Sequence, residues 1–244
     1  MKQLMHKTFH ALGFNVSRYP GFSTLERRLA RLMATKNVDL VLDVGANVGQ
    51  FAGLLRRNGY KGRIASFEPI KATFVTLAAT AEADKLWTIY QVALGSEEGQ
   101  RTMNVMQGTD LSSFYHPSDY GKACFATEVV THQEIVQVAR LDRFLSEEMK
   151  AEIGTAQRKS IFLKIDTQGH DLDVFKGAEG VLASVVVLLM ELSVRPIYQG
   201  TPNWLEVIQE VQSKGFLLFD LFPIQNDKEG AVIEYDGLFV RNGN

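Results

Sequence analysis

The stretch VLDVGANVGQF (Val41–Phe51) decides the fold. An apolar segment runs into an aspartate, two glycines bracket Ala-Asn-Val, and apolar residues then recur at helical spacing. This order is typical of a strand that turns sharply into a helix, because Gly45 and Gly49 let a ligand approach the bare backbone. In open α/β sheets ligands bind beyond the carboxyl ends of the strands, so the turn is a candidate binding site.

Strand and helix patterns alternate along the rest of the chain. The alternation predicts an α/β fold with a doubly wound, mostly parallel sheet that is covered by helices on both faces. The two final strand patterns, 216–222 and 233–241, have no helix between them, so they should pair as an antiparallel hairpin at one edge. The earlier predicted strands are residues 39–44, 63–67, 86–94, 161–165 and 185–191.

The chain of 244 residues is expected to form one domain with an extension at its N-terminus. Residues 1–38 have leucines at helical spacing and none of the binding motifs, which predicts a helical extension. Residues 39–244 form the predicted catalytic domain. Within it, residues 96–140 contain two loosely alternating segments around a polar loop, and this pattern predicts a hairpin-like insertion.

Composition narrows the class of protein. The net charge of −2 argues against nucleic acid as a partner, since no basic surplus exists to neutralise phosphates. The single cysteine, Cys124, suits a reducing compartment. The start of the chain lacks the apolar core of a signal peptide, and the longest apolar run, Val185–Met190, is far short of the ~20 residues that span a bilayer. We therefore expect a cytoplasmic enzyme without an integral membrane segment. The composition does not decide between a monomer and a homo-oligomer.

Two carboxylates indicate the ligand. Asp43 at the first strand tip would repel a pyrophosphate and attract an amino group. S-adenosylmethionine (SAM) has an ammonium and a sulfonium but no phosphate. Glu68, in SFEP at the next strand tip, follows at the distance at which an acidic residue binds ribose hydroxyls. SAM is therefore the predicted cofactor; in the alternative interpretation, Asp43 caps the turn and Glu68 is merely exposed.

Six motifs occur in one order between Leu40 and about Leu192: LDVGANVGQF, SFEP, QVALGSEEG, LDRFL, LKIDTQGHDLDVFKGAEGVL and LLMELS. In this combination the sequence resembles the FkbM family of SAM-dependent methyltransferases. The resemblance implies a class I methyltransferase-like (Rossmann-type) fold whose seven-stranded sheet has a reversed last strand. It implies methyl transfer to a hydroxyl of a sugar, a glycan or glycolipid, or a natural product. It also implies the cofactor-binding residues Asp43, Gly45, Asn47 and Gly49 at the methionine end, and Glu68 at the ribose.

Two further residues complete the predicted cofactor site. Ala93 lies in QVALGSEEG, and Ser112 lies in the loop GTDLSSFYHP (Gly108–Pro117), which would cover the cofactor. An ordinary polar loop tip is the alternative for Ser112. The family frequently has glutamate where this chain has Gln168.

The predicted chemistry centres on SIFLKIDTQGHD (Ser160–Asp171). Methyl transfer to oxygen requires that the acceptor is aligned and loses a proton. Lys164 and Asp166 share one face of a buried strand, which is costly unless they are paired or used. Asp166 at the strand tip is also expected near the cofactor, His170 follows within a turn, and Glu191 at the next strand tip would orient the acceptor or Lys164. In the alternative, Asp166 caps the helix and His170 faces solvent.

A divalent metal and two other functions stay as alternatives. Asp166, His170, Asp171 and Asp173 would suit a hard divalent cation, but acidic residues crowd the first turn of many helices because of the helix dipole, so a metal is not favoured. A non-catalytic SAM-binding module would leave Lys164 without a purpose. An NAD-dependent dehydrogenase is less favoured, because the pattern G-x-x-x-G lacks its third glycine.

Overall fold

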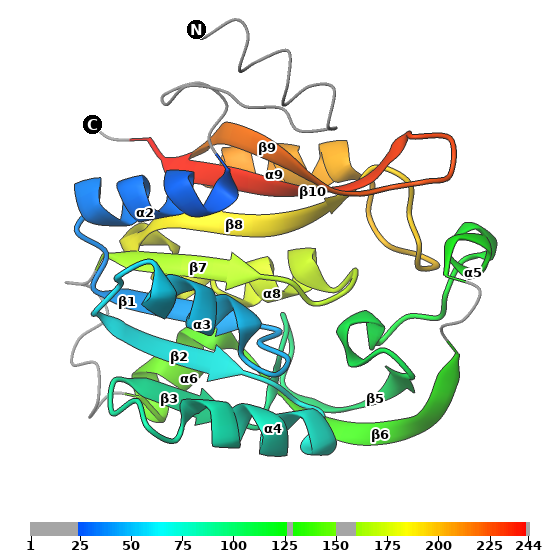
Figure 1. The fold of residues 1–244 in the computed structure, drawn as a ribbon, viewed down its shortest axis with the longest axis horizontal. Helices are drawn as coiled ribbons and strands as arrows, with labels where there is room; N and C mark the ends of the chain where they lie inside the picture. Colours follow the sequence, from blue (N-terminus) through cyan, green and yellow to red (C-terminus); the bar gives the residue numbers. More distant parts are fainter. Residues whose placement is uncertain (1–23, 126–128, 150–159, 243–244) are drawn as a thin grey trace, which may run out of the picture.

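A mixed sheet of seven strands forms the centre of the molecule (Figure 1). The computed structural model describes residues 24–125, 129–149 and 160–242, so residues 1–23 of the predicted extension lie outside the described part. The strand order is β3-β2-β1-β7-β8-β10-β9, in which β10 runs antiparallel to both its neighbours and the other pairs are parallel. The predicted class I arrangement with a reversed last strand and an antiparallel edge is confirmed. The strands are β1 Leu40–Val44, β2 Arg63–Phe67, β3 Trp87–Tyr90, β7 Ile161–Ile165, β8 Val185–Ser193, β9 Phe216–Asn226 and β10 Val232–Arg241.

Helices cover both faces of this sheet (Figure 1). Helices α2, α3 and α4 lie on one face, and α6, α8 and α9 lie on the other. β1 and β7 are buried along their whole lengths, as expected for central strands enclosed on both faces. The helices are α2 Leu25–Thr35, α3 Gln50–Arg57, α4 Lys71–Ala81, α6 Leu141–Glu147, α8 Asp171–Gly177 and α9 Trp204–Ser213, and the 3-10 helix η3 Glu179–Ser184 follows α8.

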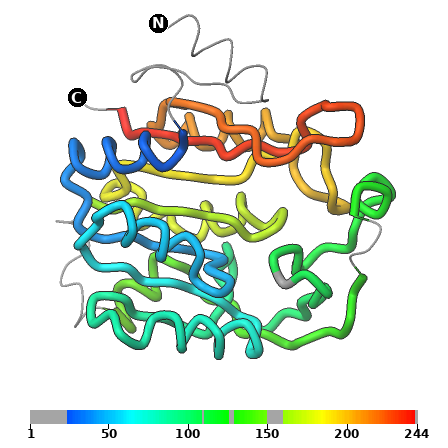
Figure 2. The backbone as a smooth tube through the Cα atoms, viewed as in Figure 1, coloured from blue at the N-terminus to red at the C-terminus, as the bar shows by residue number. Residues whose placement is uncertain are grey.

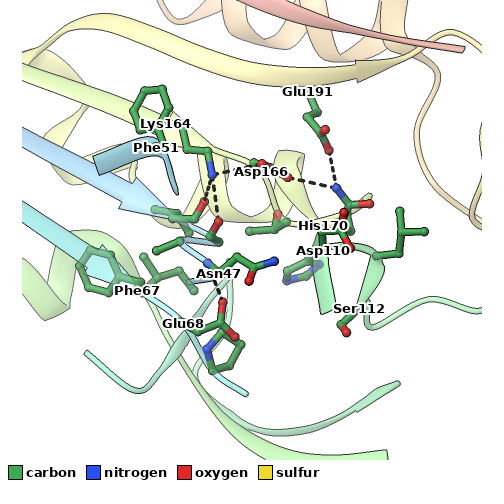
Figure 3. A pocket seen from close by; sticks show the side chains of 18 of the residues that line it. Asn47, Phe51, Phe67, Glu68, Asp110, Ser112, Lys164, Asp166, His170 and Glu191 are labelled. Carbon is green, nitrogen blue, oxygen red and sulfur yellow. Dashed lines mark hydrogen bonds and ion pairs between the residues drawn. The ribbon is translucent and has the colours of Figure 1, made fainter. Parts of the chain in front are cut away.

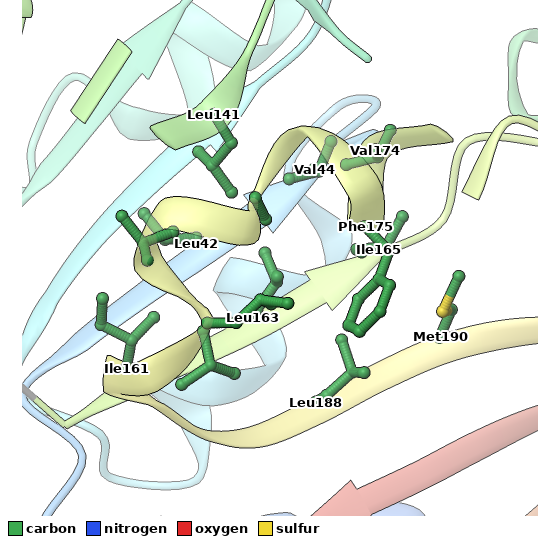
Figure 4. Close-up of a cluster of buried hydrophobic side chains, with 14 of the residues drawn as sticks. Leu42, Val44, Leu141, Ile161, Leu163, Ile165, Val174, Phe175, Leu188 and Met190 are labelled. Carbon is green, nitrogen blue, oxygen red and sulfur yellow. The ribbon is translucent and has the colours of Figure 1, made fainter. Parts of the chain in front are cut away.

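The larger core cluster lies between the central strands and α8 (Figure 4). Phe175 of α8 is fully buried there against the strands, together with Leu163 and Leu188. A second cluster on the opposite face includes Leu29 and Met33 of α2. The boundary predicted at residue 39 therefore falls within a packed core, because α2 helps to bury the central strands.

A smaller sheet, with the order β4-β6-β5, lies beyond the carboxyl ends of the parallel strands (Figures 1 and 2). β5 and β6 pair antiparallel within the segment that was predicted as a hairpin-like insertion. The predicted strand 86–94 is in fact split, since β3 ends at Tyr90 and β4 joins the smaller sheet. The elements here are β4 Ala93–Leu94, β5 Gly99–Met106, the 3-10 helix η1 Thr109–Leu111, α5 Asp119–Cys124 and β6 Val130–Ala139.

Two helix predictions differ from the structure for local reasons. Pro69 is not the first helical residue, because α4 begins only at Lys71. The Glu68 carboxylate accepts the Ile70 N–H at 2.9 Å, so a side chain satisfies this backbone donor just before the helix begins. The helix predicted from about Asp171 to Leu182 is divided, since α8 ends at Gly177 and the 3-10 helix η3 follows from Glu179.

Candidate functional site

A cavity of about 340 Å³ lies at the carboxyl ends of the parallel strands (Figure 3). This volume is in the range of sites for small ligands. Most of the predicted site residues line it, and they come from β1, β2, β4, β7 and β8, from the loops after them and from the η1 segment. Those residues are Gly45, Asn47, Glu68, Ala93, Ser112, Lys164, Asp166, His170 and Glu191. Asp43 and Gly49 were also predicted to contact the cofactor, but they do not line the cavity.

The glycine turn, which we define as residues 45–49, is built by close backbone contacts. Gly45 has a φ of 73°, and a Cβ there would lie 1.8 Å from the Asp166 carbonyl oxygen, so only glycine fits. The amides of Gly45 and Ala46 both donate to the Phe67 carbonyl, at 3.1 and 3.0 Å. Gly49, with a φ of 92°, packs against the ring of Trp87, which explains why it faces away from the cavity.

Glu68 closes one end of the cavity. Its Oε2 accepts the Asn47 N–H at 3.0 Å, its Oε1 accepts the Ile70 N–H, and only 5% of the residue is exposed. Burial raises the pKa of Glu68 to about 7, although the two backbone hydrogen bonds oppose this rise. Each carboxylate oxygen can accept a second hydrogen bond, so Glu68 can receive ribose hydroxyls from the cavity side.

Asp43 is buried behind the cavity wall. Its Oδ2 accepts the Ser66 hydroxyl at 3.1 Å, and its Oδ1 lies 3.4 Å from the Lys164 ammonium. Burial raises the pKa of Asp43, and the nearby Lys164 charge opposes the rise. The side chain of Asp43 turns toward its neighbours in the sheet, where it is 0% exposed, and it does not reach the cavity in this structure.

Lys164 is held by four oxygens. Its Nζ donates to the Gly45 carbonyl at 2.9 Å and lies 3.4 Å from the Val44 carbonyl, and it forms ion pairs with Asp166 at 3.2 Å and with Asp43. Burial alone would lower the pKa of Lys164, but the charges of Asp166 and Asp43 outweigh it and raise the pKa. Lys164 therefore stays protonated at neutral pH and cannot accept a proton from an acceptor.

Gln168 joins the two predicted catalytic carboxylates, Asp166 and Glu191. Its Nε2 donates to Asp166 at 3.1 Å and to Glu191 at 2.9 Å, while its Oε1 accepts the Tyr198 hydroxyl at 2.9 Å. Gln168 has a φ of 53°, which is uncommon for a residue other than glycine, and Ser113 holds its carbonyl oxygen at 2.6 Å. A backbone held in this way fixes the side-chain amide between the two carboxylates.

Two further carboxyl groups, those of Glu234 and Asp236 near the start of β10, lie beside Glu191 at the same end of the cavity. Glu191 lies directly opposite Asp236 in the strand register, and Glu234 is two residues away from Asp236 on the same face. Burial is the main cause that raises the pKa of Glu191 well above its ordinary value, and the neighbouring carboxylates, Asp166 first, raise it further. Burial and neighbouring carboxylates also raise the pKa values of Glu234 and Asp236 to about 7. Within the described part of the chain, none of the three forms an ion pair with a cation.

His170 is buried and neutral. Only 2% of it is exposed, which excludes the solvent-facing alternative. Its Nδ1 lies 3.1 Å from an Asp173 oxygen and its Nε2 lies 3.3 Å from the Arg101 guanidinium. Burial lowers the pKa of His170 to about 4. Because a guanidinium only donates, Nε2 is the accepting nitrogen and its lone pair is already used. His170 therefore shapes the cavity without a free basic nitrogen.

Asp171, not Asp166, accepts the free backbone N–H groups of the loop between β7 and α8. The carboxylate of Asp171 accepts the N–H groups of Thr167 and Gly169, at 3.0 and 3.1 Å. Asp166 thus has no capping role and faces the cavity with Gln168 and Lys164 as partners. The alternative interpretation of Asp166 as a helix cap does not fit this geometry.

Sequence reasoning missed several lining residues. Glu234 and Asp236 alternate in VIEYDG, and this spacing on a strand was the available signal that both face one side. Tyr198, which does not line the cavity but binds Gln168, lies in a loop and had no such signal. Among the described residues, no group of three or more His, Cys, Asp and Glu side chains has the geometry to hold a metal ion. No helix in that part of the chain is long and apolar enough to cross a membrane.

The sequence matches one family model and one curated relative, and both are methyltransferases. Residues 43–218 match the model of the Methyltransferase FkbM domain. Methyltransferase 1 of Beauveria bassiana (strain ARSEF 2860) is 25% identical over 150 residues, which are 57% of this chain and 58% of that protein. This chain therefore matches less than two thirds of that relative.

Solved structures with a similar fold are methyltransferases of several kinds. An rRNA methylase from Streptococcus thermophilus has a TM-score of 0.49 and 8% identity, over 91% of this chain and 99% of that one. The O-methyltransferase TomG from Streptomyces achromogenes has a TM-score of 0.48 and 14% identity, over 98% of this chain and 86% of that one. At these scores the likenesses carry no information on the acceptor.

Proposed function

The chain belongs to the FkbM family of methyltransferases, and from this premise we propose that it transfers the methyl group of SAM to a hydroxyl of a sugar, a glycan or glycolipid, or a natural product. The observation that carries the proposal is the pair Asp166 and Glu191, which Gln168 holds side by side in the wall of the cavity. A hydroxyl is a poor nucleophile until its proton is removed, and this pair offers oxygens to align it and to receive the proton.

One end of the cavity fits SAM. Glu68 presents oxygens that can accept ribose hydroxyls, and Ala93 and Ile70 add an apolar surface beside it. Gly45 and Asn47 of the glycine turn line the wall between Glu68 and Asp166, where the methionine portion would lie. When bound, SAM supplies the methyl group and the sulfonium leaving group.

The opposite end fits the acceptor, and its two carboxylates have different roles. Asp166 shares its charge with Lys164, so it is suited to accept a hydrogen bond and to orient the hydroxyl. Glu191 lines the cavity and has no cationic partner among the described residues, so we assign to it the acceptance of the proton, which requires its ionised form. Gln168 keeps both in place through its amide.

The charges at this end also restrict the acceptor. Lys164 is the only lysine or arginine among the described residues that line the cavity, and its contacts are used within the protein. A phosphate or carboxylate on the acceptor would face Glu191, Glu234 and Asp236 without a free cation to pair with, which makes its desolvation costly. The acceptor should therefore be a small molecule or saccharide that is uncharged near the reacting hydroxyl.

Mass spectrometry tests this function. The purified protein is incubated with SAM carrying a deuterated methyl group and with a panel of uncharged polyhydroxyl compounds, their phosphate esters and cell extracts. We expect label on oxygen in an uncharged compound, together with release of S-adenosylhomocysteine, and loss of both with Glu191→Gln. Label on nitrogen or carbon, or a protein that does not bind SAM in calorimetry, would contradict the proposal.

A further inference from the structure

A row of polar side chains crosses four neighbouring strands beneath α3 and α4. The Trp87 indole N–H of β3 donates to the Ser66 hydroxyl of β2 at 2.9 Å, and that hydroxyl donates to Asp43 of β1 at 3.1 Å. Asp43 then forms the ion pair with Lys164 of β7 at 3.4 Å. The strand register places Asp43 directly opposite both Ser66 and Lys164, so the row is built into the sheet.

Stability alone does not explain this row. Asp43 and Ser66 are both 0% exposed and Lys164 is 6% exposed, and the surrounding side chains form an apolar core cluster. A buried ion pair must recover the cost of removing two charges from water, and well-packed apolar residues often serve stability equally well or better. Charges kept in such a place therefore suggest a role beyond folding.

Both ends of the row contact the glycine turn. At one end, Lys164 binds the carbonyl of Gly45 and the carboxylate of Asp166, so one ammonium joins the glycine turn to a predicted catalytic side chain. At the other end, the Trp87 ring packs on Gly49, where an added Cβ would lie 2.7 Å from a ring carbon. The two ends of the glycine turn are thus tied to one continuous row.

We propose that Lys164 is a positioning residue, which, supported by Asp43, Ser66 and Trp87, fixes the glycine turn and Asp166 in the arrangement that binds SAM. This inference rests on the proposed function and adds to it a mechanical role for two residues that the sequence had assigned to catalysis and to the cofactor. Lys164 acts through the backbone of the turn and through Asp166, and it exchanges no proton with the acceptor.

A charge-removal cycle separates this role from a purely structural one. Lys164→Met leaves the Asp43 carboxylate buried without its cation, so we expect a large fall in the urea midpoint of unfolding. The double variant Lys164→Met with Asp43→Asn removes both charges and should regain most of that midpoint. Its Kd for SAM, measured by calorimetry, should remain at least about tenfold weaker than that of the wild type, since no ammonium holds the turn.

The controls decide between the outcomes. Lys176→Met removes an exposed lysine of α8 and should leave both midpoint and Kd unchanged. A double variant that regains both the midpoint and the wild-type Kd would overturn the positioning role and leave a structural ion pair. A wild type that binds no SAM would instead refute the proposed function itself.

A milder variant covers the case in which the double variant does not fold. Ser66→Ala retains both charges but removes the hydroxyl that joins Trp87 to Asp43. We expect the Kd for SAM to be weaker by about threefold or more. A change of this size is measurable and corresponds to the free energy of a weak hydrogen bond. An unchanged Kd in this folded variant would equally overturn the proposal.

Discussion

Replacement of Glu68 by glutamine tests the cofactor end of the cavity. The variant keeps the side-chain shape but offers one accepting oxygen where the wild type offers two. The N–H groups of Asn47 and Ile70 both need an acceptor, so one of them would face the new NH₂ group. Glutamine has almost the volume of glutamate, but it removes one hydrogen-bond acceptor. Alanine is the larger change, because it would leave both N–H groups without an acceptor.

The magnitude follows from the change of a charged to a neutral acceptor. Hydrogen bonds to charged groups contribute roughly 1.5–3 kcal/mol and neutral ones roughly 0.5–1.5 kcal/mol. For two ribose hydroxyls the loss is about 2 kcal/mol, which corresponds to a Kd for SAM weaker by about 30-fold. Calorimetry well above pH 7, where Glu68 is ionised, measures this difference, and Glu97→Gln on the exposed surface is the matched control.

The pH dependence provides a second measurement on the same residue. Burial raises the pKa of Glu68 from 4.5 to about 7 in the free protein, so its contribution to the free energy of unfolding is present below 4.5 and is lost as the pH rises through 7. SAM affinity should change in the opposite direction and weaken as the pH falls through 7, because the charged form binds the ribose. Glu68→Gln should abolish this part of the pH dependence. A folded variant with a Kd within threefold of the wild type would refute the assignment of Glu68 to the ribose.

The remaining predictions concern the acceptor end and the glycine turn. Glu191→Gln should lower kcat by about 10²–10⁴-fold with SAM affinity unchanged, whereas Asp166→Asn should mainly raise the KM for the acceptor; steady-state kinetics with the identified acceptor would show the reverse split if the roles are exchanged. Gln168→Glu should weaken acceptor binding and lower the unfolding midpoint near pH 8, because a donor between two carboxylates becomes a further negative charge; equal midpoints for variant and wild type would contradict this. Sinefungin, whose ammonium replaces the methyl sulfonium of SAM, should bind more tightly than S-adenosylhomocysteine, whose sulfur carries no charge, and Asp236→Asn should reduce that preference in competition calorimetry. Gly45→Ala should not give a stable SAM-binding protein, because its Cβ would overlap the Asp166 carbonyl, and a wild-type melting temperature would show that the turn adapts.

The sheet was predictable because its central strands are short, mostly apolar runs and because helices with apolar stripes lie between them in the sequence. Buried strands such as β1 and β7 leave little ambiguity in such a pattern. The split of the predicted strand 86–94 was not predictable, since the same apolar residues suit either sheet and only the tertiary pairing of β4 with β6 decides between them. The same limit applies to α2. The spacing of its leucines predicts a helix, but it does not predict that these leucines pack in the core beside the central strands.

The site was predictable as a set of positions, not as a set of contacts. Strand tips gave the location of Glu68, Asp166 and Glu191, because the carboxyl ends of parallel strands meet at one edge. The direction of Asp43 was not visible from its motif, since its partner Lys164 lies 121 residues away in the chain and next to it in the sheet. Proximity to the glycine turn therefore suggested a ligand contact where the structure has an ion pair.

The neutral amide of Gln168 explains how the acceptor end can hold so many carboxyl groups. Asp166, Glu191, Glu234 and Asp236 all line the cavity, and the one lysine there is already bound to Asp166 and to backbone carbonyls. A glutamate at position 168 would add a further charge, and it would have to be protonated or meet a cation to remain there. An amide donates a hydrogen bond to each of two carboxylates at once, so it links them without any cation. The chain thus holds Asp166 and Glu191 together through hydrogen bonds from one neutral side chain, and Lys164 remains available to the glycine turn.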